Sequence, residues 1–319
     1  MPTLFSPDAD TSHGSAPASA PPVRFAVIGD FGTENGNFKT EGRVPDFIKQ
    51  WKPDFIVSLG DSAYSDHSEK QNAFEVDVWN FYKDYILKPE DDPEGKATRF
   101  FPTLGNHDYH ASGGGVFPAR FAAYKAMFAV PAGPGGHHYY EFARGPVRFF
   151  VLDSNQVSES DGWKKNSAQW KWLDERVAAA KEPWKLGILH HSPFHSAKKN
   201  EGDVWMRDWN FESRGLTAVI AGHSHVYERV MKGSFPFFTN GVGGNNIVTA
   251  KDARVPGSTV VYDKAAAMKQ DLGNKDHGAM LVEATPSTLT VEFWTVGAVR
   301  QDRWPANAPE LTRPPQAVT

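Results

Sequence analysis

The chain has 319 residues, of which 40% are hydrophobic, so it can bury a core of ordinary density. Its formal net charge is −4 at pH 7, so we expect no electrostatic attraction to nucleic acid or to an anionic membrane. It contains no cysteine, which excludes disulfides and thiolate metal sites and leaves His, Asp, Asn and Tyr as the expected metal ligands. No stretch approaches the roughly 20 apolar residues of a membrane span.

Residues 1–22 are rich in Ala, Ser and Pro and show no periodic pattern. They also lack the basic start and apolar centre of a secretory signal, so we expect a flexible N-terminal extension or the remnant of a processed leader. A single domain is predicted over residues 23–303, because neither a linker nor an internal repeat divides it. Residues 304–319 are expected to form a C-terminal tail.

The first half of the domain predicts a parallel βαβ unit. An apolar run over 23–28, bounded by prolines and Gly29, is typical of a buried strand. Apolar residues at helical spacing predict a helix over 42–51, and a second strand follows at 54–59. The elements expected next are helices over 68–87 and 116–128, a strand over 99–104, and a hairpin formed by 139–142 and 147–152.

The second half predicts one more helix and then mainly strands. Residues 167–180 have a clean apolar face at helical spacing, with Ser167 as the N-cap. Apolar strands are predicted over 184–189, 216–221, 235–239, 258–262, 279–284 and 289–296. We therefore expect one α/β domain whose C-terminal third supplies mostly antiparallel strands.

Five short motifs carry the side chains that can do chemistry. In chain order they are Gly29-Asp30-Phe31-Gly32, Gly60-Asp61-Ser62-Ala63-Tyr64, Gly105-Asn106-His107-Asp108, Ile188-Leu189-His190-His191 and Gly222-His223-Ser224-His225. Their polar residues lie at or near predicted strand ends, and ligands of parallel α/β sheets gather beyond the C-terminal ends of the strands. The glycines suit sharp turns that bring the backbone close to an ion or a phosphate. The motifs are therefore predicted to meet at one site.

The motifs supply seven side chains with metal-binding oxygen or nitrogen atoms: Asp30, Asp61, Tyr64, Asn106, His191, His223 and His225. A structural zinc ion needs only four ligands, whereas seven side chains with one bridging carboxylate can hold two ions. Two ions about 3.5–4 Å apart suit displacement at phosphorus, because both polarise phosphate oxygens and a shared water becomes hydroxide near neutral pH. Each residue alone also has a structural interpretation as a cap, a turn residue or a buried ring, but the ordered set favours metals.

In this order the motifs resemble those of the purple acid phosphatases, the tartrate-resistant acid phosphatase-like branch of the calcineurin-like metallophosphoesterases. The resemblance extends from about Val23 to about Arg303. It implies a four-layer α/β/β/α sandwich and a dinuclear centre that pairs Fe(III) with a divalent iron, zinc or manganese ion. By position, the ferric ion would be bound by Asp30, Tyr64 and His225. The divalent ion would be bound by Asn106, His191 and His223, and the bridging ligand would be Asp61.

Gly32 and Tyr64 decide the branch within that family. Diesterase relatives usually carry histidine at the position of Gly32 and lack the tyrosine, and a phenolate favours a hard, highly charged ion. The resemblance therefore implies an acid phosphatase that hydrolyses small phosphomonoesters by attack of metal-bound hydroxide. It also implies a periplasmic or secreted location, although no clear signal peptide is visible. The alternatives are a phosphodiesterase or pyrophosphatase on the same metal core, and a phosphate-binding metalloprotein without turnover.

Two histidines are candidates for catalysis beside the metals. His107 follows Asn106 directly, so its ring is expected to bind phosphate or to help the leaving group depart. The family usually has another histidine well after the position of His191, whereas here the nearest one, His195, follows after only four residues. The general acid is therefore either His195 or water.

Neighbouring residues have supporting interpretations. His190 alternates with His191 at a strand end, so it is predicted to point away from the site. Asp108 is expected to orient a nearby ligand or His107. The glycine-rich stretch over 241–246 is either the loop that follows a late strand in the resembling family or a plain tight turn.

Overall fold

The structure is a computed structural model that describes residues 21–32, 43–64, 73–109, 118–156, 162–198, 204–270 and 276–305. Nearly all of the expected N-terminal extension and C-terminal tail, and the beginning of the helix predicted from residue 68, lie outside this part of the chain. None of the helices within it is long and apolar enough to cross a membrane.

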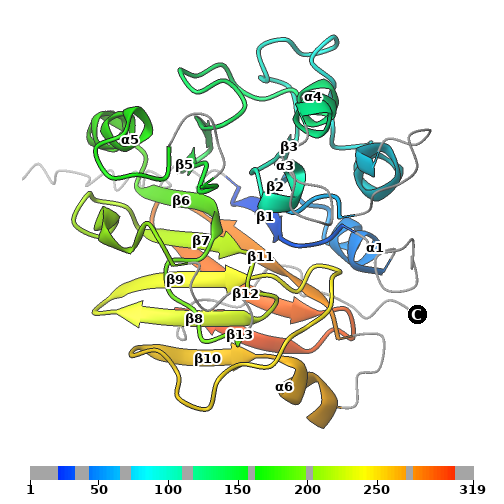
Figure 1. Ribbon diagram of the computed structural model, residues 1–319, viewed down its shortest axis with the longest axis vertical. Coiled ribbons are helices and arrows are strands. Elements are labelled where there is room, and N and C mark those ends of the chain that lie inside the picture. The colour runs from blue at the N-terminus through cyan, green and yellow to red at the C-terminus, as the bar shows by residue number, and fades with distance from the viewer. Residues whose placement is uncertain are drawn as a thin grey trace, which may run out of the picture.

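Six strands form the first sheet, in the order β13-β12-β11-β1-β2-β3 (Figure 1). They are β1 (Val23–Ile28), β2 (Phe55–Ser58), β3 (Phe100–Phe101), β11 (Gly278–Ala284), β12 (Leu289–Thr295) and β13 (Arg300–Trp304). β1, β2 and β3 are parallel, which confirms the predicted βαβ unit, with α1 (Arg43–Gln50) as its helix. β11, β12 and β13 extend the sheet from β1 in antiparallel fashion, as expected for the C-terminal third.

Seven strands form the second sheet, in the order β10-β8-β9-β7-β6-β5-β4. They are β4 (Tyr140–Arg144), β5 (Val147–Val151), β6 (Trp184–His191), β7 (Ala218–Gly222), β8 (Tyr227–Lys232), β9 (Phe235–Asn240) and β10 (Ser258–Tyr262). β4 and β5 form the predicted hairpin, and β5, β6, β7 and β9 run parallel at the centre. β8 and β13 were not predicted from the sequence.

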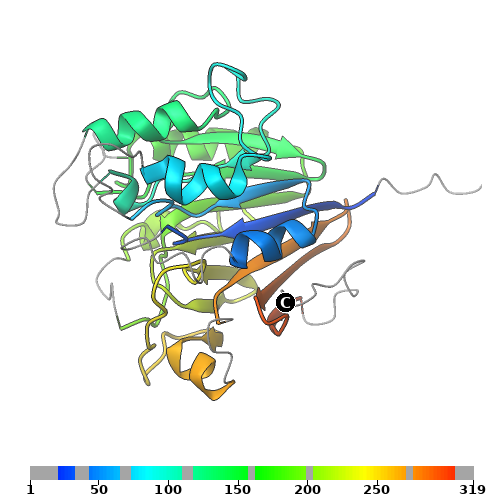
Figure 2. The same cartoon turned by 90° about the vertical axis from the view of Figure 1, so that its right-hand side faces the viewer.

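Helices cover the outer faces of both sheets and complete the expected α/β/β/α sandwich. α5 (Ala168–Ala179) begins after Ser167, whose Oγ accepts a hydrogen bond from the backbone N–H of Trp170, and packs on the second sheet. α1 lies along the first sheet (Figure 2), and α4 (Pro118–Met127) contributes Tyr124 and Met127 to the same hydrophobic core. The remaining short helices are a π-helical turn (Glu75–Trp79), α2 (Asn80–Tyr82), α3 (Asn106–Tyr109), a 3₁₀ turn (Arg207–Trp209) and α6 (Lys264–Lys269).

Aromatic rings fill the space between the two sheets. Phe149 of β5 is fully buried, and its ring centroid lies 5.1 Å from that of Phe25 in β1 and 5.6 Å from that of Phe55 in β2. Further along the sandwich, Tyr227 of β8 stacks on Phe293 of β12 at 4.2 Å. Because aromatic side chains bury large apolar areas and prefer such stacked or edge-on geometries, these contacts fix how the two sheets lie on each other. That alignment positions the functional site.

Candidate metal centre

The polar motifs of both sheets meet at the carboxyl ends of the parallel strands. Asp30 and Asp61 follow β1 and β2, whereas His191 ends β6 and His223 follows β7. The backbone N–H of His223 donates to Asp30 Oδ2 at 2.8 Å, which joins the two sheets at this edge. The site therefore lies where ligands of parallel α/β sheets are expected.

Four of the seven ligand candidates have a strained backbone conformation. Asp30, Asp61, His223 and His225 have φ angles of 56°, 51°, 69° and 39°. For residues other than glycine this left-handed region costs about 1–3 kcal/mol each, and such strain is typical of sites whose function requires one side-chain direction. The strain at these four positions therefore agrees with a functional role for the motifs.

Two glycines allow the turns after β2 and β3 to touch. Gly60 has a φ of 91°, and a Cβ atom there would lie 2.6 Å from the backbone nitrogen of Gly105. A Cβ atom on Gly105 would lie 2.2 Å from Asp61 Oδ1. Any larger residue would push apart the turns that carry Asp61 and Asn106, so glycine is required at both positions.

Three ligand candidates form a triangle on one side of the site. Tyr64 Oη lies 3.1 Å from Asp30 Oδ1, to which it donates, and 3.1 Å from His225 Nε2. His225 Nε2 lies 3.5 Å from Asp30 Oδ1. Neighbouring ligands of an octahedral ion with bonds near 2.1 Å are separated by about 3 Å. The three atoms are therefore spaced like one face of a coordination shell.

The environment of Tyr64 supports a cation at this position. Burial, followed by the charges of Asp30 and Asp61, raises the pKa of Tyr64 well above its usual value. The phenol is therefore protonated unless a positive charge offsets the two carboxylates. A highly charged ion held by the same atoms would supply that charge and favour the phenolate.

The other candidates, Asn106, His191 and His223, form a second group. A further residue, whose direction was predicted wrongly from the sequence, joins them. His190, predicted to point away, is fully buried, and its Nε2 lies 3.1 Å from Asn106 Oδ1, 3.1 Å from His223 Nδ1 and 3.4 Å from Asp61 Oδ1. The nitrogen atoms that His190, His191 and His223 can offer lie within 4.8 Å of one another. This group therefore contains one more imidazole than expected.

A β-bulge explains why the alternation rule failed. β6 pairs Ile188 with Ile220 of β7 but His191 with Gly222, so three steps along β6 match two along β7. A bulge of this kind interrupts the regular alternation of side chains. Consecutive histidines at the end of β6 can therefore both face the site.

Asp61 lies between the two groups. Burial raises its pKa, but His190 and His107 more than offset this effect and hold the pKa well below its usual value. Its Oδ1 also accepts the backbone N–H of His107 at 2.8 Å. Asp61 is therefore a fixed carboxylate, which is what a bridging ligand must be.

Three supporting contacts hold the ligand candidates in place. Asp108 accepts the backbone N–H groups of Ser62 at 3.0 Å and Gly105 at 2.8 Å, so it orients the turns beside Asp61 and Asn106. Ser154 Oγ, which the sequence analysis did not single out, lies 2.9 Å from His191 Nδ1. Such outer contacts fix the tautomer and orientation of ligating rings.

The glycine-rich stretch over 241–246 wraps around the first group. The backbone N–H groups of Gly243 and Asn245 donate to the carbonyl oxygens of Gly29 and Asp30, both at 3.0 Å. His225 Nδ1 lies 3.0 Å from the carbonyl oxygen of Asn246, which turns Nε2 toward Tyr64. The stretch therefore supports the site, beyond being a tight turn.

The two catalytic candidates differ in position. The ring of His107 is partly exposed and lies against Tyr64, with ring centroids 4.4 Å apart. Burial lowers the pKa of His107, an effect that Asp61 partly offsets. His195 is buried in the loop after β6. The structure thus places His107 in direct contact with a ligand candidate, Tyr64.

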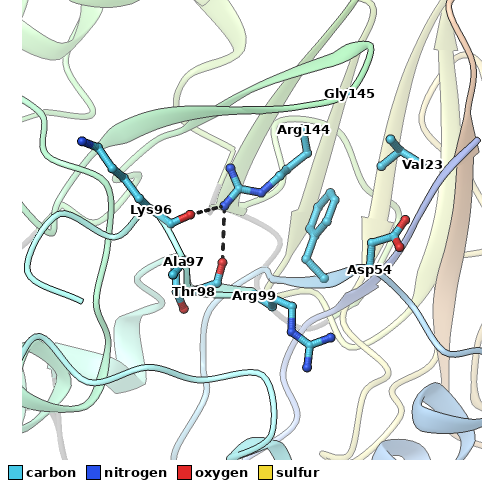
Figure 3. A pocket seen from close by; sticks show the side chains of 9 residues that line it. Val23, Asp54, Lys96, Ala97, Thr98, Arg99, Arg144 and Gly145 are labelled. Atoms are coloured by element: carbon cyan, nitrogen blue, oxygen red, sulfur yellow. Dashed lines mark hydrogen bonds between the residues drawn. The ribbon is translucent and has the colours of Figure 1, made fainter. Parts of the chain in front are cut away.

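The structure also contains a cavity at the edge of the sheets opposite the metal-centre candidates. It has a volume of about 310 Å³ and is lined by Val23 at the start of β1, Asp54 just before β2 and Arg144 at the end of the antiparallel strand β4 (Figure 3). Arg144 Nη2 donates to the carbonyl oxygens of Lys96 and Thr98 at 3.0 and 3.4 Å. This guanidinium is engaged by the main chain, so the metal-centre edge remains the better functional candidate.

Comparison with known proteins identifies the family of this chain. The calcineurin-like phosphoesterase family model matches residues 23–227, and the chain belongs to that family. It is similar to phosphoenolpyruvate phosphatase of Allium cepa, at 28% identity over 64% of this chain and 41% of that protein. It is also similar to tartrate-resistant acid phosphatase type 5 of Mus musculus, at 22% identity over 95% of this chain and 94% of that protein.

The structural comparison confirms the fold expected from the motifs. A purple acid phosphatase from yellow lupin seeds superposes with a TM-score of 0.64 at 18% identity, over 87% of this chain and 52% of that one. The family match and the relatives of similar sequence, taken with this fold, confirm the resemblance to purple acid phosphatases. The chain spans only 41% of the length of the phosphoenolpyruvate phosphatase from Allium cepa.

Proposed function

We propose that this protein is a dinuclear-metal phosphatase of the purple acid phosphatase type that hydrolyses phosphomonoesters. The observation that carries the proposal is the triangle of Tyr64, Asp30 and His225 beside the carboxylate of Asp61, because a buried phenol between two carboxylates suits a ferric ion. The second ion would be divalent iron, zinc or manganese, held by Asn106, His191 and His223. Relatives named as acid phosphatase and phosphoenolpyruvate phosphatase support a monoester substrate.

The protein's own residues have defined roles in this proposal. When bound, the two ions would supply Lewis acidity for the phosphate oxygens and lower the pKa of water. Asp61 bridges the two groups and holds the backbone of His107. His107, which is partly exposed beside Tyr64, would contact a phosphoryl oxygen or the leaving group. His195 is the proposed general acid, with water as the alternative.

Metal analysis with a visible spectrum tests the centre. We expect two metal ions per chain, at least one of them iron, and a violet band from charge transfer between the Tyr64 phenolate and the ferric ion. Two equivalents of zinc or manganese in a colourless protein would refute the ferric assignment and leave Tyr64 as a packed ring.

A pair of substrates tests the reaction. The fully metallated protein is expected to hydrolyse p-nitrophenyl phosphate much faster than bis-p-nitrophenyl phosphate. The reverse preference would favour the diesterase alternative. Hydrolysis of neither compound, nor of pyrophosphate, by protein with both ions bound would favour phosphate binding without turnover.

The role of His107 gives a separate prediction. His107→Ala should retain both metal ions but lower kcat for p-nitrophenyl phosphate by about 10²-fold, the typical contribution of one positioned acid–base or hydrogen-bonding group. His137→Ala is the matched control, because that ring binds the carbonyl oxygen of Phe128, outside the site. Full turnover by His107→Ala with both ions present would contradict the assigned role.

A further inference from the structure

The contacts of His190 are not explained by any of the ligand roles that the family resemblance implies. This residue is fully buried at the end of β6, directly before His191. Among the described residues, two compact groups of potential ligands share it, Asp30–Asp61–His190 and His190–His191–His223. Within each group the candidate ligand atoms lie within 4.8 Å of one another. His190 thus lies between the two halves of the site.

One side of the His190 ring is fixed by the main chain. Nδ1 lies 2.8 Å from the carbonyl oxygen of Leu59, the residue that follows β2. A carbonyl oxygen can only accept, so Nδ1 carries the hydrogen and donates it. A Cβ atom on Gly60 would lie 2.7 Å from Nδ1, so the ring is also confined by the β2 turn. In the neutral ring the lone pair is therefore on Nε2, which faces the site.

The neighbours of Nε2 are electron-rich. Asn106 Oδ1 and His223 Nδ1 each lie at 3.1 Å, and Asp61 Oδ1 lies at 3.4 Å. An amide oxygen and a carboxylate oxygen beside Nε2 favour a positive charge between them, which a proton on Nε2 supplies without a metal and which a bound ion would supply in its place. The spacings match the roughly 3 Å that separates neighbouring ligands of one octahedral ion. They repeat the spacing of the Tyr64, Asp30 and His225 triangle.

We propose that Nε2 of His190 is an additional protein ligand of the divalent ion. This inference rests on the proposed function, because it requires that an ion bind beside Asn106, Asp61 and His223. Histidine is a common ligand of divalent transition ions, and a ring whose second nitrogen donates to a carbonyl oxygen is held in the tautomer that a ligand needs. The divalent side of the centre then has three imidazoles, from His190, His191 and His223.

Metal affinity in matched variants provides the first test. His190→Gln and His190→Leu are compared with His137→Gln, in which the lost ring also binds a main-chain carbonyl oxygen but lies outside the site. Metal-free protein is titrated with zinc against a competing chelator after one equivalent of iron is bound. We expect the zinc affinity of both His190 variants to fall by at least about 10–100-fold, because losing a direct ligand should cost no less than losing an outer-shell partner. The control should bind zinc as the unmodified protein does.

A spectroscopic readout separates a ligand from a residue that only positions others. With Co(II) in the divalent site, each coordinated imidazole whose remote nitrogen is protonated gives a strongly shifted, exchangeable N–H proton signal. The His190 variants should lose one such signal, with circular dichroism confirming that they fold. A His190→Gln protein that binds zinc normally and keeps every shifted signal would overturn the proposal while leaving the phosphatase intact. Failure of the unmodified protein to bind a second ion would overturn the proposed function itself.

Discussion

Replacing Asp61 with asparagine is expected to lower phosphomonoester turnover by on the order of 10³-fold or more, because losing one ion removes several kcal/mol of transition-state stabilisation and each 1.36 kcal/mol is a factor of ten. Metal content should fall from two ions per chain to about one. Asparagine keeps the shape of the side chain and the Oδ1 acceptor for the N–H of His107. The charge, which a bridge between two cations needs, is what the substitution removes.

The measurement is kcat for p-nitrophenyl phosphate together with metal content on the same sample. Asp54→Asn is the matched control: Asp54 lies just before β2, at the opposite end from Asp61, and its Oδ2 accepts the N–H of Arg24 at 2.8 Å. This control should retain both ions and nearly full turnover. An Asp61→Asn protein with two ions and turnover within tenfold of the unmodified protein would show that another group bridges the metals.

The ligand motifs were visible in the sequence because their geometry is local. Asp30 and Asp61 each follow an apolar strand and a glycine, and parallel strands bring such positions to one edge. The structure brings these side chains together with Tyr64 and His225 as the motifs predicted. The position of His190 could not be predicted in this way, because it depends on a bulge against β7 that is a property of the strand pair.

The two strands that the sequence analysis missed have a different explanation. β8 contains Glu228 and Arg229, and β13 contains Asp302, so neither strand reads as an apolar run. In the folded chain Arg229 binds Asp302 through both Nε and Nη2, at 2.8 and 2.9 Å, and the hydroxyl of Tyr227 donates to the same carboxylate. These polar groups satisfy one another across the two sheets, a long-range pairing that no local pattern reveals.

The second large effect is a loss of stability when a ring between the two sheets is removed. Phe149→Ala is expected to lower the free energy of unfolding by about 3–5 kcal/mol, the usual loss for a buried phenylalanine. The ring is fully buried between the sheets, against Phe25 and Phe55, and it stacks on Phe142 with ring centroids 4.5 Å apart. Alanine would leave a cavity that this ring cluster cannot close without moving both sheets.

Urea denaturation of the metal-free protein measures this loss without the contribution of bound ions. The slope of the unfolding free energy against urea concentration should stay unchanged, while the urea concentration at the midpoint falls. As a control, Met268→Ala, at a side chain that is 72% exposed, should leave the midpoint nearly unaltered. Phe149→Leu should recover part of the loss, because it refills part of the cavity. A Phe149→Ala protein destabilised by less than about 1 kcal/mol would contradict the packing, since a fully buried ring cannot be removed at so low a cost if both sheets rest on it.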